Sequence, residues 1–240
     1  MAAILPKDRN RIFVDVLWTA LFSSSCIFFM IEEKPFKHIA VAGNIGSGKT
    51  TLTQLLSRHY GWKPHYENNA ENPYVSDFYR DMKHWSFHMQ VYYLNQRFEQ
   101  MLHFRKGDET VIQDRTIYED AFIFAPNLHS MGLMTTRDFE NYFSLFNLMD
   151  SFVSSPDLLI YLRASVPTLV NQIQQRGRDY EESIRLDYLK RLNERYEAWI
   201  STYDKGKLLI VDVDNNNFME NQEDLGKIIN MIDAEIHGLF

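Results

Sequence analysis

The segment 43–51, GNIGSGKTT, combines residue types that bind phosphate groups. Gly43, Gly48, Lys49 and Thr50 occupy the fixed positions of the pattern G-x-x-x-x-G-K-[ST]. In such a loop, backbone N–H groups turn toward phosphate oxygens, the lysine bridges the β- and γ-phosphates, and the hydroxyl ligates Mg²⁺. An apolar run precedes the loop and a helical pattern follows it, as the pattern requires. We therefore predict that a nucleoside triphosphate binds at Gly43, Asn44, Ile45, Gly46, Ser47, Gly48, Lys49, Thr50 and Thr51.

The group that receives the phosphate must be identified from the rest of the chain. The sequence contains neither the N-K-x-D motif with which GTPases read guanine nor the L-S-G-G-Q motif of ABC ATPases. Both classes are therefore excluded, and a kinase for a small molecule or a nucleotide is favoured. Such an enzyme needs an acceptor site and a lid, and we expect both to follow the loop in the chain.

From residue 38 onward, the hydrophobic pattern alternates between strands and helices. Short apolar runs predict strands at 38–43, 63–67, 110–114, 158–162 and 207–213. Helices are predicted from the loop to about residue 60, over 78–104 with a break near 83–84, over 188–203 and over 225–237, with a polar surface loop at 213–221. Strands separated by helices pair in parallel through right-handed crossovers. The predicted fold class is α/β, a P-loop NTPase three-layer sandwich with a five-stranded parallel sheet and a helical lid.

Charged side chains follow the second and third predicted strands, where an open α/β sheet presents groups to its ligand cleft. Glu67 ends the second strand, and a carboxylate there can accept the proton of an attacking hydroxyl, a general-base role worth roughly 10²–10⁴-fold in rate. Glu71 is the competing candidate for this role. Asp114 and Arg115 follow the third strand, where they serve a metal and a phosphate or form a structural ion pair.

Four further segments carry a family resemblance: YENNAENPY (66–74), WSFHMQVYYLNQR (85–97), DRTIYED (114–120) and QRGRDYEE (175–182). Their order, spacing and context resemble the deoxyribonucleoside kinase family, and most closely its bacterial deoxyadenosine kinase-like branch. The resemblance extends from about residue 38 to the C-terminus. It implies an ATP-dependent enzyme that uses Mg²⁺ to transfer the γ-phosphate to the 5′-hydroxyl of a deoxynucleoside in purine salvage. It also implies a homodimer built through the long helices.

The resemblance assigns catalytic and metal-binding roles. Glu67 matches the family's catalytic base, and Lys49 and Arg115 act on the phosphates, Arg115 also near the base. Asp114 and Thr50 are the expected Mg²⁺ ligands. The family usually has Glu-Arg-Ser where this chain has Asp-Arg-Thr. Because aspartate is one methylene shorter than glutamate, the contact of Asp114 with the metal is expected to include a bridging water.

The resemblance also assigns the residues that select the nucleobase. Gln90 and Arg97 are seven residues apart, hence on one face of a helix, and a glutamine amide offers a donor and an acceptor to a base edge. Arg97 and Asp120 match the pair with which the family reads a base's polar edge. This pair favours a purine or cytosine over thymine, and we expect deoxyadenosine to be the preferred substrate.

The sugar and the lid have matching residues as well. Tyr79 and Glu181 match the family's residues at the sugar 3′-hydroxyl. Arg176 and Arg178 lie in a glycine-containing turn, and arginines there suit a lid that neutralises charge on the transferred group. The family often has another arginine where this chain has Gln172, which leaves open how the two lid arginines divide their roles.

Composition excludes several other classes of function. The 240-residue chain has a net charge of −7, so it offers no basic stripe for nucleic acid. Its one cysteine, Cys26, excludes an intramolecular disulfide and a cysteine-based zinc site. The histidines His65, His84, His88 and His103 show only one i, i+4 pair and no third ligand, so we expect no structural metal.

Residues 1–37 differ in character from the rest of the chain. Val16–Ile31 is apolar apart from one threonine and three serines, and Met30 precedes a sequence typical of the start of a P-loop protein. We expect residues 1–37 to be a dispensable leader, or the result of a start codon placed too early, and residues 38–240 to form the kinase domain of a cytoplasmic enzyme. A membrane anchor is the alternative interpretation of the leader.

Two alternative functions stay open at the level of sequence. A thymidylate-type nucleoside monophosphate kinase shares the loop but needs extra cations for the phosphate of its acceptor. A non-catalytic, membrane-tethered nucleotide-binding protein is compatible with the apolar leader, although Lys49, Thr50 and Glu67 argue against it.

Overall fold

The computed structural model describes residues 37–67, 72–104, 107–178, 181 and 184–238. The apolar segment Val16–Ile31, Cys26 and the competing base Glu71 lie outside the described residues, so the predictions about them stay predictions. Within the described part of the chain, no helix is both long enough and apolar enough to cross a membrane.

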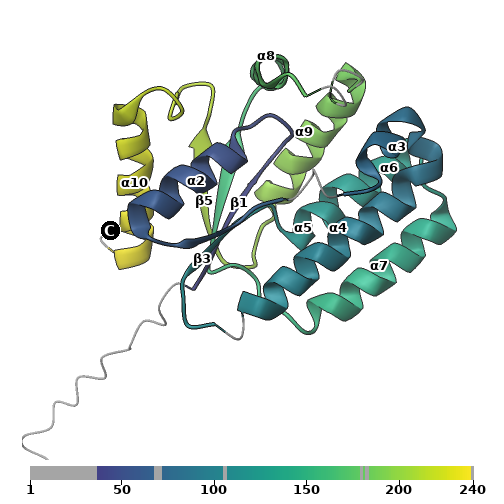
Figure 1. Cartoon of the computed structure of the whole chain (residues 1–240), viewed down its shortest axis with the longest axis horizontal. Helices are drawn as coiled ribbons and strands as arrows, with labels where there is room; N and C mark the ends of the chain where they lie inside the picture. Colours follow the sequence, from purple (N-terminus) through teal and green to yellow (C-terminus); the bar gives the residue numbers. More distant parts are fainter. Residues whose placement is uncertain (1–36, 68–71, 105–106, 179–180, 182–183, 239–240) are drawn as a thin grey trace, which may run out of the picture. The chain divides into compact units, whose positions relative to one another are not determined.

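The core of the fold is a parallel sheet (Figure 1). Its five strands are arranged in the order β2-β3-β1-β4-β5. The strands are β1 His38–Gly43, β2 Lys63–His65, β3 Val111–Asp114, β4 Leu158–Arg163 and β5 Lys207–Asp212. The strand β1 is central and pairs with both β3 and β4, which places its carboxyl end between theirs. The predicted α/β class and five-stranded parallel sheet are confirmed.

Helices cover both faces of the sheet. They are α2 Lys49–Tyr60, α3 Val75–Arg80, α4 Met82–Phe104, α5 Ile117–Glu119, the π-helical turn η1 Asp120–Phe124, α6 Ala125–Ser130, α7 Thr136–Asp150, α8 Val166–Arg176, α9 Leu186–Ser201 and α10 Gln222–His237. Successive β1 side chains point to opposite faces. Ile39 and Val41 pack with residues of α2 and α10, whereas Ala40 and Ala42 pack with residues of α4, α7 and α9. The result is a three-layer arrangement (Figure 1).

Several element boundaries differ from the sequence prediction by one to three residues, including those of the first long helix and of β2. The first long helix begins at Val75 and breaks at Asp81, not near 83–84, because Asp81 leaves helical geometry and its carboxylate accepts the His84 N–H as a helix cap. The strand β2 ends at His65, so Glu67 lies two residues beyond it.

The sequence predicts a polar surface loop at 213–221, after β5, but part of this loop lies in the core. Phe218 is buried, and its ring lies against Gly48 at the start of α2. Side chains within the loop fold it back: Asn216 donates to the Asp212 carbonyl, and the Asn217 N–H donates to Asp224. Phe218 and Met219, the two apolar neighbours in this polar segment, therefore cover the end of the phosphate-binding loop.

Candidate active site

The phosphate-binding loop connects the carboxyl end of β1 to the first turn of α2. Gly46 and Gly48 have φ values of 85° and 89°, which favour glycine. A Cβ atom on Gly46 would lie 2.8 Å from Ile173 Cγ1 and 2.9 Å from the Leu169 carbonyl oxygen. No side chain of the cap residue Gly48 occupies the N-terminus of α2, so the helix presents its N–H groups and partial positive charge to an anion.

Lys49 extends over this loop. Its Nζ donates to the Asn44 carbonyl oxygen at 2.9 Å, and the side chain is buried. Burial, and secondly the nearby Arg115, lower the pKa of Lys49 to about 7, against the opposing effect of Asp114 and other carboxylates. A bound phosphate would place a negative charge beside Lys49 and so stabilise its charged ammonium form against the cost of burial.

Thr50 and Asp114 form the expected metal-binding pair. The Thr50 hydroxyl donates to Asp114 Oδ2 at 2.5 Å. The other carboxylate oxygen, Oδ1, is buried and has no hydrogen-bond partner among the described residues. A hydroxyl and a carboxylate with a free oxygen are ligands that suit Mg²⁺, so the donor set fits this ion.

Arg115 has an uncommon backbone conformation directly after β3. Its φ is 71°, and its N–H donates to the Val41 carbonyl oxygen at 3.0 Å. The guanidinium lies 4.4 Å from the centroid of the Phe124 ring, and its Nε lies 3.7 Å from Glu67 Oε2. Strained backbone of this kind persists where the surrounding structure imposes it, often at functional sites.

Glu67 lies between two arginines. Arg97 Nη2 donates to Glu67 Oε1 at 2.6 Å, and Arg97 Nη1 donates to Asp120 Oδ2 at 2.6 Å. Arg97 itself is buried and lies over the Tyr93 ring, 4.8 Å from its centroid. The two guanidinium groups stabilise the ionised carboxylate and hold it in one orientation.

One cavity of about 450 Å³ brings most of the predicted site residues together. Its lining includes Ile45, Gly46, Gly48, Lys49, Thr50, Thr51, Glu67, Tyr79, Gln90, Arg115, Asp120, Arg176, Arg178 and Glu181. Among the residues that the structure describes, five predicted ones do not line the cavity: Gly43, Asn44, Ser47, Arg97 and Asp114. Arg97 lies behind Glu67 and Asp120, and Asp114 behind Thr50, so each reaches the cavity through a neighbour.

The end of the cavity formed by α3 and α4 suits a nucleobase. Gln90 is 1% exposed, and its Oε1 is buried without a hydrogen-bond partner among the described residues. The apolar side chains of Val75, Phe78, Met89 and Phe124 line the same cavity. An apolar slot with one unpaired amide oxygen is complementary to a flat ring that carries an amine.

The lid arginines are paired with an acidic residue in this structure. Arg176 forms a bidentate pair with Glu181, with Nε to Oε2 at 3.0 Å and Nη2 to Oε1 at 2.6 Å. Arg178 Nη1 lies 3.5 Å from Glu181 Oε1. Glu181, which the resemblance assigns to the sugar, thus joins the two lid arginines, while Gln172 lines the cavity beside them.

Several residues of the site were not predicted from the sequence. Phe124, Tyr188 and Met219 line the cavity from η1, α9 and the loop after β5. Glu119 is fully buried behind the loop. A signal for Glu119 was present, because Thr116 and Glu119 have the T-x-x-E spacing of a helix capping box. Phe218 and Met219 are also visible as two apolar residues in a polar segment.

Comparison with known proteins identifies similar chains across nearly the whole described region. A family model described as deoxynucleoside kinase matches residues 39–237. A deoxyadenosine/deoxycytidine kinase of Bacillus subtilis is 36% identical over 83% of this chain and 93% of its own. A deoxyguanosine kinase of Lactobacillus johnsonii is 36% identical over 82% of this chain and 92% of its own. A deoxyadenosine kinase of Dictyostelium discoideum is 34% identical over 87% of this chain and 84% of its own.

Solved structures of a deoxyadenosine kinase are similar to this chain as well. A deoxyadenosine kinase from M. mycoides with bound dATP superimposes with a TM-score of 0.73 at 30% identity, covering 82% of this chain and 99% of that one. The same enzyme with bound dCTP gives a TM-score of 0.72 at 29% identity, with the same coverage.

Proposed function

The chain belongs to the deoxynucleoside kinase family, and we propose that it transfers the γ-phosphate of ATP, with Mg²⁺, to the 5′-hydroxyl of a deoxynucleoside, with deoxyadenosine preferred. The observation that carries the proposal is that Glu67, Lys49 and Arg115 line one cavity. Family membership argues against the thymidylate-type kinase and the non-catalytic binding protein.

The donor end of the cavity provides the groups for a triphosphate. Backbone N–H groups of the loop and the start of α2 bind the phosphate oxygens, and the Lys49 ammonium bridges the outer phosphates. Thr50 and Asp114 would hold Mg²⁺, which when bound neutralises charge on the phosphates. Arg176 and Arg178 act from the lid.

Glu67 takes the proton of the 5′-hydroxyl as the 5′-oxygen bonds to the γ-phosphorus. The bond from the γ-phosphorus to the β–γ bridging oxygen breaks, and ADP leaves with the electron pair of that bond. Arg115 Nε lies 3.7 Å from Glu67 Oε2 and lines the same cavity. Its fixed charge stabilises the negative charge on the equatorial oxygens in the transition state.

The acceptor end is complementary to adenine. The amide of Gln90 can accept from the N6 amine and donate to N1, while Asp120 offers a second acceptor held by Arg97. Tyr79 and Glu181 are assigned to the 3′-hydroxyl. The relatives are named for deoxyadenosine, deoxycytidine and deoxyguanosine, and the M. mycoides enzyme has been solved with dATP and with dCTP. These names support a purine or cytosine as the base. The proposed preference for adenine among them rests on the hydrogen bonds that the Gln90 amide can form.

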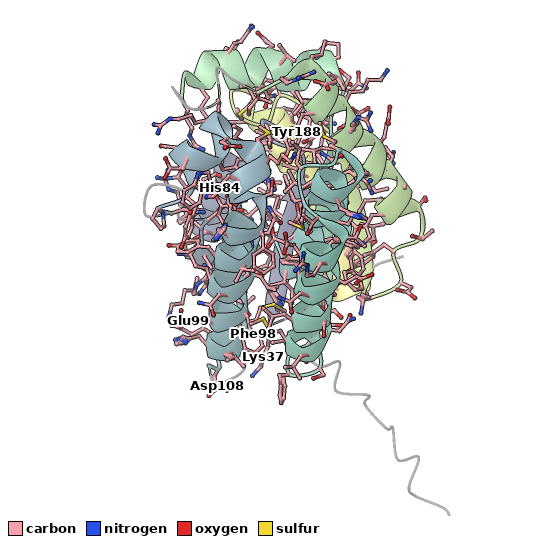
Figure 2. The ribbon with its side chains drawn as sticks, turned by 90° about the vertical axis from the view of Figure 1, so that its right-hand side faces the viewer. Lys37, His84, Phe98, Glu99, Asp108 and Tyr188 are labelled. Atoms are coloured by element: carbon pink, nitrogen blue, oxygen red, sulfur yellow. The ribbon has the colours of Figure 1, made fainter. Side chains whose placement is uncertain are left out.

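The long helices offer the surface for the expected homodimer. Helices α4 and α7 lie side by side on one flank, and Figure 2 shows His84, Phe98 and Glu99 along α4. His84 and Glu99 are exposed there. A homodimer through this flank and a cytoplasmic location are part of the proposal.

A substrate panel tests the proposed function. The initial rates of ATP consumption are measured with deoxyadenosine, deoxyguanosine, deoxycytidine and thymidine, and with the four monophosphates as matched acceptors. We expect deoxyadenosine to give the highest kcat/KM, thymidine the lowest by at least about tenfold, and the monophosphates no turnover. Thymidine as the best acceptor would refute the base assignment, and turnover of monophosphates alone would refute the proposed reaction.

A further inference from the structure

Glu119 is a buried carboxylate that the proposed mechanism does not use. It ends α5, directly before Asp120, and its side chain is 0% exposed. A buried carboxylate is costly unless hydrogen bonds stabilise its charge. The groups that donate hydrogen bonds to Glu119 therefore indicate the role of this side chain.

Three donors from three separate segments converge on this carboxylate. The Gly43 N–H donates to Oε1 at 3.2 Å, and the Tyr196 hydroxyl donates to the same oxygen at 2.8 Å. The Thr116 N–H donates to Oε2 at 2.8 Å. Glu119 thus joins the first residue of the phosphate-binding loop, the turn after β3 and the middle of α9.

Two of these segments carry residues of the proposed catalytic apparatus. Gly43 opens the loop that ends in Lys49 and Thr50. Thr116 directly follows Arg115, whose φ of 71° depends on its surroundings. Gly43 has no side chain through which to be held, so its N–H is the group by which a neighbouring side chain can fix the start of the loop.

Helix α9 supports the loop at a second point. Asn44 Nδ2 donates to the Leu189 carbonyl oxygen and to Asn193 Oδ1, each at 3.1 Å. Leu189, Asn193 and Tyr196 are spaced by four and three residues, so they lie on one face of α9. Helix α9 therefore holds the loop directly through the bonds of Asn44, and indirectly through the bond of Tyr196 to the Glu119 carboxylate.

We propose that Glu119 is a positioning residue for phosphoryl transfer, whose carboxylate fixes the phosphate-binding loop relative to the turn that carries Asp114 and Arg115. An ionised carboxylate has only acceptors, so two oxygens can take three donors. A glutamine of the same shape would point an N–H₂ group at either Thr116 N–H or Gly43 N–H and leave that donor unpaired. The inference rests on the proposed function, because it assigns the loop to the phosphates of the donor nucleotide.

The test compares Glu119→Gln with Tyr196→Phe, which removes one donor and leaves both backbone bonds. The dissociation constants of Mg-ATP and of deoxyadenosine are measured by titration calorimetry, with circular dichroism to verify folding. We expect Glu119→Gln to weaken Mg-ATP by about tenfold or more, the effect of one unpaired buried donor, and to leave deoxyadenosine within about twofold. Tyr196→Phe should leave both constants within about twofold.

A structural role alone would lower the melting temperature of Glu119→Gln and leave its affinity for Mg-ATP unchanged, which would overturn the proposal. Equal weakening of both ligands would also overturn it. If Glu119→Gln does not fold, Glu119→Asp retains the acceptors with a shorter reach and should weaken Mg-ATP selectively, by less than tenfold. Failure of the unmodified protein to bind Mg-ATP would instead refute the proposed function on which the inference rests.

Discussion

Arg97 bonds Glu67 from Nη2 at 2.6 Å while its Nη1 bonds Asp120 at the same distance. One guanidinium therefore orients both the residue assigned to the chemical step and a residue assigned to the base. Lysine could not replace it, because an ammonium is a point charge without a planar fork. In the proposed mechanism, base selection and proton transfer therefore both depend on the position of this one buried side chain.

Arg97→Met should reduce both stability and turnover. The substitution leaves two carboxylates without their shared cation, and breaking a buried ion pair typically costs about 3–5 kcal/mol in the free energy of unfolding. We expect a loss of this size in urea denaturation and a fall in kcat/KM of at least about 100-fold. The matched control is Arg58→Met, at an exposed arginine of α2. Unchanged stability and turnover in Arg97→Met would contradict the dual role.

His38 should make the stability depend on pH. Burial lowers the pKa of His38 to about 4 in the folded protein, despite its hydrogen bond with Gln113. The unfolded chain takes up a proton near its ordinary pKa of 6.5, so the contribution is present above that pH and is lost as the pH falls toward 4. Between pH 7.5 and pH 5, we expect the unmodified protein to lose about 2 kcal/mol more than His38→Gln does. Parallel pH profiles for the two proteins in urea denaturation would exclude this effect.

The apolar N-terminal segment should be dispensable for catalysis. Every recognised motif begins after Met30, and the family model starts at residue 39. A chain that begins at Met30 should fold and retain the kcat/KM of the full chain for deoxyadenosine within about twofold. Loss of folding or of activity on this truncation would show that the segment contributes to the core or to a subunit interface.

The sequence predicted what local patterns determine and missed what distant contacts determine. The loop from Gly43 to Thr51 and the central strands are local patterns, and both were predicted. The break was predicted near residues 83–84 and lies at Asp81, because hydrophobic periodicity does not mark the bond from the His84 N–H to the Asp81 carboxylate. The ion pair of Arg97 with Glu67 spans 30 residues and the bond of Tyr196 to Glu119 spans 77, so no local pattern indicates either.

The ion pairs of the lid arginines could not be predicted from the sequence either. Arg176, Arg178 and Glu181 were each predicted at the site, but in separate roles. Their mutual pairing depends on how the segment after α8 folds, and spacing alone does not determine this.

The most direct test of the account is the rate of phosphoryl transfer in Glu67→Gln. Glutamine retains the size and polarity of the side chain but cannot take a proton. With saturating ATP and deoxyadenosine, single-turnover formation of the 5′-monophosphate should slow by roughly 100-fold or more, while the dissociation constant of Mg-ATP stays within about twofold. A variant that forms the 5′-monophosphate at a near-normal rate would show that Glu67 is not the catalytic base.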